Sequence, residues 1–161
     1  MHVKHQFLYL KLMNIKKISY YFSTSFGIGN SKFFPGTLAS LVTLPIVWLI
    51  KDFFSLYFFL IALFFYSLTS YFLIKICIKN TTNKDTKYIV ADEHIGQSIS
   101  LIFCEQEIVD YILALCLFRF FDIVKPFPIN LVDNKVKNAF GVILDVFLAG
   151  LFFCIIISFA F

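Results

Sequence analysis

Long uncharged stretches alternate with short polar segments along this chain. Residues 38–50 and 53–74 contain no Asp, Glu, Lys or Arg, and residues 139–161 contain a single charge, Asp145. A helix needs about 20 apolar residues to cross a bilayer core of roughly 30 Å, so the second and third stretches can each span alone. The first stretch is shorter. We expect its helix to begin near Gly36 and to form a hairpin with residues 53–74 around a charged tip.

Two further apolar stretches are interrupted by polar residues. Residues 89–103 and 108–121 are apolar apart from a few charged or polar side chains, chiefly Asp92, Glu93, His94, Gln97, Asp110 and Arg119. Pro126 and Pro128 then end the helix, and Lys125 is expected to be extended because it precedes a proline. The pattern predicts an all-α fold, a polytopic membrane helical bundle of about four to five membrane helices.

Basic residues are concentrated in three segments of the chain. Residues 1–37, 75–93 and 119–138 carry all of them except Lys51, which lies at the first of two intervening tips. The positive-inside rule therefore places the N-terminus and both basic loops in the cytoplasm. The basic N-terminal segment is expected to lie at the membrane interface, near anionic headgroups.

Composition excludes several classes of protein. The chain is 60% hydrophobic and 15% charged, whereas a soluble domain is typically about half apolar and a quarter charged. Disordered chains are polar and highly charged, so that class is excluded too. The net charge of +4 lies in loops between apolar runs, which argues against a nucleic-acid partner. The four cysteines form no CxxC pair and are expected to be small buried hydrophobes.

The first candidate site is the glycine-containing segment FGIGNSKFFPGT. Gly27 and Gly29 allow tight turns and a close approach to a ligand, while Ser31 and Thr37 offer hydroxyl groups. The free N–H groups at the start of the following helix favour an anion such as phosphate. The alternative is a plain turn followed by a helix cap.

The second candidate site is the segment IVADEHIGQSIS. On a helix, Glu93, Gln97 and Ser100 share one polar face, with Asp92 beside them, and isoleucines form the opposite face. Two adjacent acids can simply be a solvated helix start that the helix dipole favours. The polar face continues to Ser100, however, which a cap does not need, so a functional site is favoured. His94 is expected to be a loop or packing residue.

The third candidate site begins at the segment FRFFDIVKPFP. Arg119 and Asp122 are three residues apart and can share a helix face. Further on, Gly141, Asp145 and Ala149 form a face of small residues with one carboxylate, which lets helices approach closely. Asp145 would then point into the bundle. The structural alternative is an ion pair of Arg119 with Asp145 or Asp122 that holds the helices together.

Together the three segments place acids and cations on one side of the membrane. The acids are Asp92, Glu93, Asp122, Asp133 and Asp145, and the cations are Arg119 and Lys125. Carboxylates without His or Cys suit Mg²⁺, which often bridges protein carboxylates and a substrate phosphate. The cations suit a phosphate group. The chain has no Cys-x5-Arg loop and no DxDxT motif, so attack by metal-activated water is favoured over a covalent route.

Three blocks, in this order, resemble the phosphatidylglycerophosphatase A family: GIGNSKFFPGTLASL, IVADEHIGQSISL and FRFFDIVKPFPINLVDNKVKNAFGVILDVFLAG. The resemblance implies a single membrane-embedded phosphatase domain over residues 1–161, with a basic N-terminal segment at 1–23 and a catalytic bundle at 24–161. It implies a Mg²⁺-dependent enzyme of the bacterial cytoplasmic (inner) membrane, with its active site facing the cytoplasm. The enzyme would convert phosphatidylglycerophosphate in the cytoplasmic leaflet to phosphatidylglycerol and phosphate. Membrane lipids are the expected partners, with no nucleic acid and no obligatory protein partner.

On this resemblance we assign roles to individual residues. The expected catalytic set is Glu93, Asp92, Asp122 and Lys125, with Glu93 activating or orienting the attacking water. The expected metal ligands are Asp92, Glu93, Asp122, Asp145 and Asp133. The expected substrate-binding set is Gly27, Gly29, Ser31, Thr37, Arg119 and Lys125. The chain departs from the family pattern where Val146 replaces a common Asp, Asn138-Ala139 replaces Gly-Gly, and Lys32 replaces a frequent proline.

Three alternatives stay open. The first is a phosphatase of another lipid phosphate. The second is a small membrane transporter that uses the intramembrane acids. It would need a polar path through the bilayer, and the apolar segments 53–74 and 146–161 offer almost none. The third is a non-catalytic scaffold, favoured only if Val146 has abolished activity.

Overall fold

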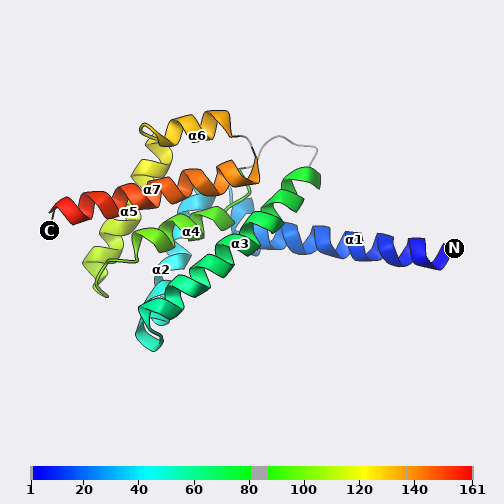
Figure 1. Cartoon of the computed structure of the whole chain (residues 1–161), viewed down its shortest axis with the longest axis horizontal. Coiled ribbons are helices and arrows are strands. Elements are labelled where there is room, and N and C mark those ends of the chain that lie inside the picture. Colours follow the sequence, from blue (N-terminus) through cyan, green and yellow to red (C-terminus); the bar gives the residue numbers. More distant parts are fainter. Residues whose placement is uncertain (1, 81–86, 137, 161) are drawn as a thin grey trace.

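The fold is all-α throughout the described part of the chain. The computed structural model describes the backbone of residues 2–80, 87–136 and 138–160, and the side chains of 13–79, 87–132, 134–136 and 138–155. Within these ranges there are helices and turns but no strand, as the hydrophobic pattern predicts (Figure 1). In chain order the elements are α1 (His2–Ser23), the 3-10 helix η1 (Ile28–Asn30), α2 (Pro35–Phe53), α3 (Leu56–Asn80), α4 (Ala91–Ser100), α5 (Ile108–Val124), α6 (Ile129–Lys135) and α7 (Ala139–Ala160).

The predicted hairpin is formed by α2 and α3. Helix α2 begins at Pro35, a residue that suits the first helical position because its missing N–H would have no partner there. The helix therefore reaches back past Gly36 as expected, and it ends where Phe54 turns to an extended conformation. Two helices of the described chain, Pro35–Phe53 and Leu56–Lys79, are long and apolar enough to cross a membrane. Helix α3 leaves large side chains such as Phe64 and Phe65 exposed, which suits contact with lipid.

Helix α4 lies at the centre of the bundle and packs against α7, α2, α3, α5 and α1. It has 10 residues, so it is about 15 Å long, half the thickness of a bilayer core. The sequence predicts a longer apolar stretch, but the helix ends at Ser100 and is too short to cross a bilayer alone. Both of its faces are buried, since Gln97 and Ser100 on the polar side and Ile95 on the apolar side are all shielded.

Glycines allow α4 and α7 to cross in close contact. A Cβ atom at Gly96 would lie 2.6 Å from a ring atom of Phe118 and 2.7 Å from the carbonyl oxygen of Val146. A Cβ atom at Gly150 would lie 2.6 Å from the carbonyl oxygen of Gly96. The sequence predicts a close approach of the last helix through Gly141, Asp145 and Ala149, whereas at the crossing with α4 the close contact is made by Gly150.

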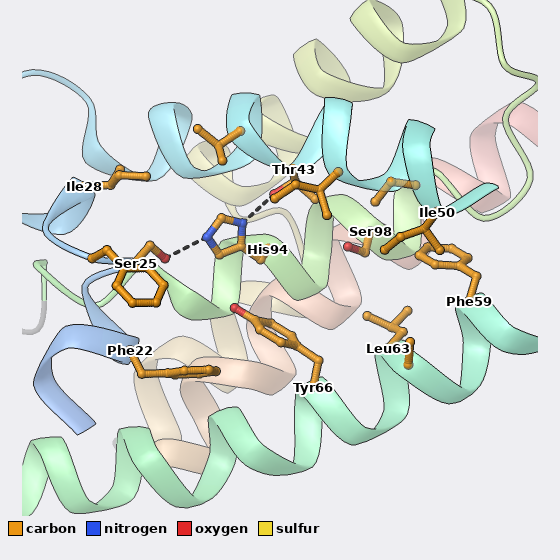
Figure 2. Close-up of a pocket in the computed structure, with 15 residues that line it drawn as sticks. Phe22, Ser25, Ile28, Thr43, Ile50, Phe59, Leu63, Tyr66, His94 and Ser98 are labelled. Carbon is orange, nitrogen blue, oxygen red and sulfur yellow. Dashed lines mark hydrogen bonds between the residues drawn. The ribbon is translucent and has the colours of Figure 1, made fainter. Parts of the chain in front are cut away.

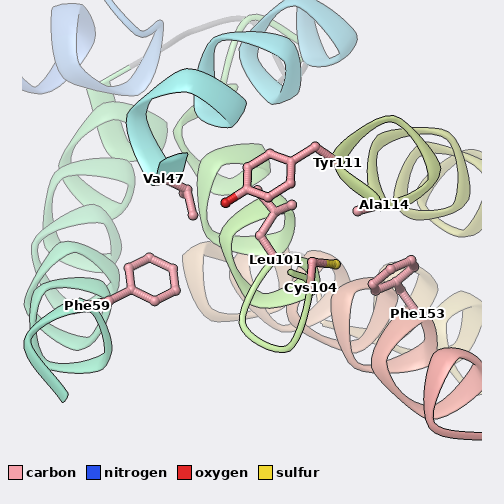
Figure 3. Close-up of a cluster of buried hydrophobic side chains, with 7 residues drawn as sticks. All are labelled: Val47, Phe59, Leu101, Cys104, Tyr111, Ala114 and Phe153. Carbon is pink, nitrogen blue, oxygen red and sulfur yellow. The ribbon is translucent and has the colours of Figure 1, made fainter. Parts of the chain in front are cut away.

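The two tips of the bundle lie together at one end and carry one basic residue, Lys51. At this end the α2–α3 tip meets the connection between α4 and α5, where Lys51 Nζ donates to the Leu101 carbonyl at 3.1 Å and Gln106 donates to the Trp48 carbonyl at 3.1 Å. Next to this contact, a core cluster joins α2, α3, α5, α7 and the α4–α5 connection (Figure 3). At the other end, the start of α2 meets the start of α4 and the last turns of α5 at Gly36, and Lys125 pairs there with Asp145 of α7.

The cysteines are free thiols, as the sequence predicts. Cys77 and Cys104 are buried, whereas Cys116 is exposed on α5. The expectation that all four are buried is therefore wrong for Cys116, because its position faces outward on an apolar helix.

Candidate active site

Three helices meet at Gly36. A Cβ atom built on this glycine would lie 2.3 Å from Glu93 Oε1 and 2.9 Å from Arg119 Nη2. The backbone at the start of α2 therefore touches the first turn of α4 and the last turns of α5. Any larger residue would push these groups apart, so the glycine of the PGT sequence is explained by this close approach.

Arg119 lies between two carboxylates. Its Nη1 atom is 2.8 Å from Asp122 Oδ2 on the same helix and 3.9 Å from Glu93 Oε1 on α4. The three side chains are only 12–15% exposed, and Arg119 Nε is buried without a hydrogen-bond partner. The predicted structural pair of Arg119 with Asp122 is thus present. Because Nε has no partner, the Arg119 guanidinium can still donate a hydrogen bond to a further group.

Asp92 and Glu93 bring two carboxyl groups into this buried position. Asp92 is 7% exposed, and the Asp92 Oδ1 and Glu93 Oε2 atoms are buried without hydrogen-bond partners. Burial, together with repulsion from Asp122, raises the pKa of Glu93 to about 7, although Arg119 opposes the shift. Burial, together with repulsion from Glu93, raises the pKa of Asp92. Buried carboxylate oxygens without partners are costly, so the group favours a cation. We call Asp92, Glu93, Arg119 and Asp122 the Arg119 cluster.

Lys125 and Asp145 form a second ion pair beside α5 and α7. The two side chains meet in a charge-assisted hydrogen bond, and the Asp145 side chain is 7% exposed. The predicted extended conformation of Lys125 is wrong, because its φ of 47° and ψ of 61° are left-handed. Its N–H bonds the Phe121 carbonyl at 2.9 Å, which caps the helix in the αL manner. Asp145 points into the bundle as expected, but toward Lys125 rather than Arg119.

The glycine-containing segment contributes less directly to the candidate site than the sequence predicts. A Cβ atom at Gly29 would lie 1.9 Å from the Tyr88 carbonyl oxygen, so this glycine lets two backbones pack. Gly27 has a left-handed φ of 104°, and the hydroxyl of Ser31 bonds the backbone of Phe33. These are the features of the turn alternative. Thr37 lies beside Gly36 in the first turn of α2, and phosphate binding by this segment stays a prediction.

The expected set of five metal ligands is not brought together. Among the described residues, no group of three or more His, Cys, Asp or Glu side chains is placed to hold a metal ion. Asp122 and Asp145 face Arg119 and Lys125, and the side chain of Asp133 lies outside the described residues. Asp92 and Glu93, with their unpartnered oxygens, still fit Mg²⁺, because this ion is commonly held by one or two carboxylates together with substrate phosphate.

His94 connects α4 to two neighbouring segments. Its Nε2 atom is 2.7 Å from Ser25 Oγ, and its Nδ1 atom is 2.6 Å from Thr43 Oγ1 (Figure 2). Thr43 donates its own hydrogen to the Ala39 carbonyl at 2.9 Å, so it accepts from Nδ1–H. Burial lowers the pKa of His94 to about 4, so the ring is neutral at pH 7. With its one proton on Nδ1, the ring accepts the Ser25 hydroxyl hydrogen at Nε2. The prediction of a packing residue is confirmed.

The sequence interpretation missed a cavity beside His94. Its lining includes Ser25, Thr43, Tyr66 and Ser98 at polar positions, and Ala62 among the aromatic residues of α3. The available signals were hydroxyl groups inside otherwise apolar stretches and a small residue in a phenylalanine-rich helix. Neither signal predicts a cavity, because a cavity depends on how the helices are placed relative to one another.

Comparison with known proteins decides the family. The model of the family described as phosphatidylglycerophosphatase A matches residues 21–161. The chain belongs to this family. Its three motif blocks, at residues 27–150, all lie inside the matched range, as do the Arg119 cluster and the Lys125–Asp145 pair.

Individual relatives agree with this family. The chain is 41% identical over 86 residues to phosphatidylglycerophosphatase A of Haemophilus influenzae, covering 51% of this chain and 53% of that protein. It thus spans about half the length of this relative. It is 29% identical over 129 residues to phosphatidylglycerophosphatase A of Escherichia coli, covering 80% of this chain and 74% of that protein.

A third relative carries a different name. A protein of Bacteroides thetaiotaomicron, provisionally named a phosphatidylinositol-3-phosphatase, is 33% identical over 149 residues, covering 85% of this chain and 89% of that protein. No solved structure matches the chain. Its membership of the phosphatidylglycerophosphatase A family places the chain among phosphatase hydrolases, and its apolar helices agree with a membrane protein.

Proposed function

We propose that this chain removes the terminal phosphate of phosphatidylglycerophosphate in the membrane. The observation that carries the proposal is the buried Arg119 cluster, in which an arginine with an unused donor lies beside two carboxyl groups with unpartnered oxygens. An arginine fork suits a phosphate group. The cluster lies in a chain of the phosphatidylglycerophosphatase A family.

In the proposed hydrolysis, each residue of the site has its own role. Arg119 in the last turns of α5, with Lys125 at the C-cap of the same helix, binds the phosphate and stabilises the negative charge that grows on its oxygens. Glu93 orients the attacking water and accepts its proton as the oxygen bonds to phosphorus. The bond from phosphorus to the glycerol oxygen breaks, and that oxygen leaves as the alcohol after taking up a proton. Asp92 and Glu93 would hold Mg²⁺, which supplies charge neutralisation at the phosphate when bound.

We also propose that the site faces the cytoplasm and acts on lipid in the inner leaflet. The starts of α2 and α4 and the end of α5 meet at the site, and Lys32, Lys87 and Lys125 lie in the connections that adjoin these helix ends. The positive-inside rule supports a cytoplasmic location for such connections. The placement suits the bacterial cytoplasmic membrane.

Phosphate release from phosphatidylglycerophosphate by the detergent-purified protein tests the function. We expect turnover that EDTA abolishes and added Mg²⁺ restores, and we expect Glu93→Gln and Asp92→Asn each to lower kcat by about 100-fold or more, as loss of a proton acceptor does. Glu105→Gln is the matched control, because Glu105 is exposed in the connection at the opposite end. Undiminished turnover in Glu93→Gln and Asp92→Asn would remove the assigned roles.

A second candidate function is hydrolysis of another lipid phosphate. The observation that favours it is the name of the Bacteroides relative, which matches 85% of this chain. A panel of phosphatidylglycerophosphate, phosphatidylinositol 3-phosphate and phosphatidate separates the two. The higher kcat/KM identifies the substrate.

A further inference from the structure

A cavity of about 400 Å³ lies between α2, α3 and α4, next to the Arg119 cluster. This volume is within the usual range for a small-molecule site. Figure 2 shows the lining residues between α2 and α3, with Phe22, Ser25 and Ile28 toward one end, His94 further in, and Ile50 and Phe59 at the other end. The proposed chemistry uses none of its lining residues, so the cavity needs an explanation of its own.

The part of the cavity around His94 carries hydroxyl groups and no charge, among apolar residues such as Phe22 and Ile28. Ser25, Thr43 and Ser98 contribute hydroxyl groups, and the neutral ring of His94 uses both nitrogens in hydrogen bonds to Ser25 and Thr43. No lining residue is an Asp, Glu, Lys or Arg. The Ser25 and Thr43 hydroxyls already donate to His94 and to the Ala39 carbonyl, so this neutral surface suits an uncharged part of a ligand and would disfavour a charged group. Since His94 directly follows Glu93, this part of the cavity begins one residue from the Arg119 cluster.

The rest of the cavity is apolar and opens sideways. Val42 and Ile46 of α2 line it and are also 39% and 47% exposed. They belong to one of the two helices that can cross a membrane, and Leu63 of the other helix lies opposite. The opening between α2 and α3 therefore faces the region where lipid chains lie. Phe59 is 2% exposed and closes the far end.

We propose that this cavity binds one acyl chain of the phospholipid substrate, which enters from the bilayer between α2 and α3. The proposal rests on the proposed function and specifies how that site selects a lipid. From Gly36 to Thr43 along α2 is about 10 Å, which leaves room for the spacer between the terminal phosphate and the acylated glycerol. From Thr43 to Ile50 is about another 10 Å, occupied by the first part of the chain.

Ala62→Trp, which fills the cavity from α3, tests the proposal. The substrates are dioleoyl phosphatidylglycerophosphate and its deacylated, water-soluble counterpart. We expect the variant to raise KM for the diacyl substrate by about tenfold or more, because each CH₂ group lost from apolar contact weakens binding several-fold. Its kcat/KM for the deacylated substrate should stay within about twofold of wild type. Ile61→Trp is the matched control, since Ile61 is the neighbouring residue and is 56% exposed. An unchanged KM for the diacyl substrate in Ala62→Trp would overturn the proposal.

Photo-labelling supplies a readout that does not need turnover. The probe is phosphatidylglycerol, the proposed product, with a diazirine in one acyl chain, incorporated into vesicles of unlabelled phospholipid. We expect labels on the cavity residues of α2 and α3, and fewer of them in Ala62→Trp than in Ile61→Trp. Labels confined to outward-facing residues such as Phe64 and Phe65 would overturn the proposal. This readout remains decisive if Ala62→Trp loses activity on both substrates equally. Wild type that labels in the cavity but hydrolyses no lipid phosphate would refute the proposed function alone.

Discussion

Gly36 is the residue at which the start of α2 contacts both a carboxylate and the arginine of the site. The contact with Glu93 and Arg119 leaves no space for even one methyl group. A side chain at this position would displace Glu93 and Arg119, so the glycine-containing segment and the Arg119 cluster are in direct contact through Gly36. This is a clearer role than the expected direct contacts of Gly27 and Gly29 with phosphate.

Gly36→Ala should lower kcat/KM by about 100-fold, the size of loss that follows a displacement of about 1 Å in an active site. The added Cβ atom would displace Glu93 Oε1, from which it would lie 2.3 Å away. Phosphate release and thermal unfolding in detergent measure the effect, and the melting temperature should change little. Leu38→Ala serves as the control because Leu38 is 40% exposed two residues further along α2. Equal activities of the two variants would contradict the assigned contact.

At the scale of elements, the short helix α4 organises the site. It is buried on its polar and apolar faces alike, which only a helix surrounded by other helices can be. The amphipathic pattern of IVADEHIGQSIS predicts its two faces correctly. The pattern cannot reveal that the polar face is covered by protein, because the neighbouring helices come from distant parts of the chain.

Gly96→Ala should separate α4 from α7 and from α5. The new Cβ atom would lie 2.4 Å from the Phe118 ring and 2.7 Å from the Val146 carbonyl, and a backbone carbonyl cannot rotate away. Overpacking of this kind costs about 1–3 kcal/mol. For a chain of this size we therefore expect a melting temperature lower by several degrees, at about 2–4 °C per kcal/mol, measured by thermal unfolding in detergent. Phe147→Ala, at an exposed position of α7, should lower it less; the opposite order would contradict the close crossing.

At the scale of the whole molecule, the connections at the two ends of the bundle differ in their content of basic residues. The basic connections and the Arg119 cluster lie at one end, while the α2–α3 tip and the α4–α5 connection lie at the other. Positive-inside counting produces the same division from the sequence alone. The count of four to five spanning helices stays a prediction, because only α2 and α3 meet the criterion for length and composition in the described chain.

Single cysteines should report opposite sides of the membrane. In a background without the four native cysteines, Lys87→Cys should react with a membrane-impermeant maleimide only after the cells are opened. Glu105→Cys should react in intact cells. Both positions are exposed, so accessibility alone does not separate them. Labelling of the two variants from the same side would contradict the orientation.

The sequence by itself determined the class of fold, the hairpin of α2 and α3, and the segments that meet at the candidate site. It could do so because each of these features is local: an uncharged run of sufficient length predicts a membrane helix, and the spacing of polar residues predicts a helix face. The resemblance of the three motif blocks predicted the family that the comparisons show.

Only the tertiary structure decided which acid faces which cation. Asp122 pairs with Arg119 and Asp145 with Lys125, whereas Asp92 and Glu93 each keep a buried oxygen without a hydrogen-bond partner. The sequence also could not show that α4 stops short of a full span, or that a cavity lies beside His94. These features depend on how closely helices distant in sequence approach one another. That approach is fixed by the side-chain volume at contacts such as Gly36 and Gly96, which is a property of pairs of residues rather than of positions along the chain.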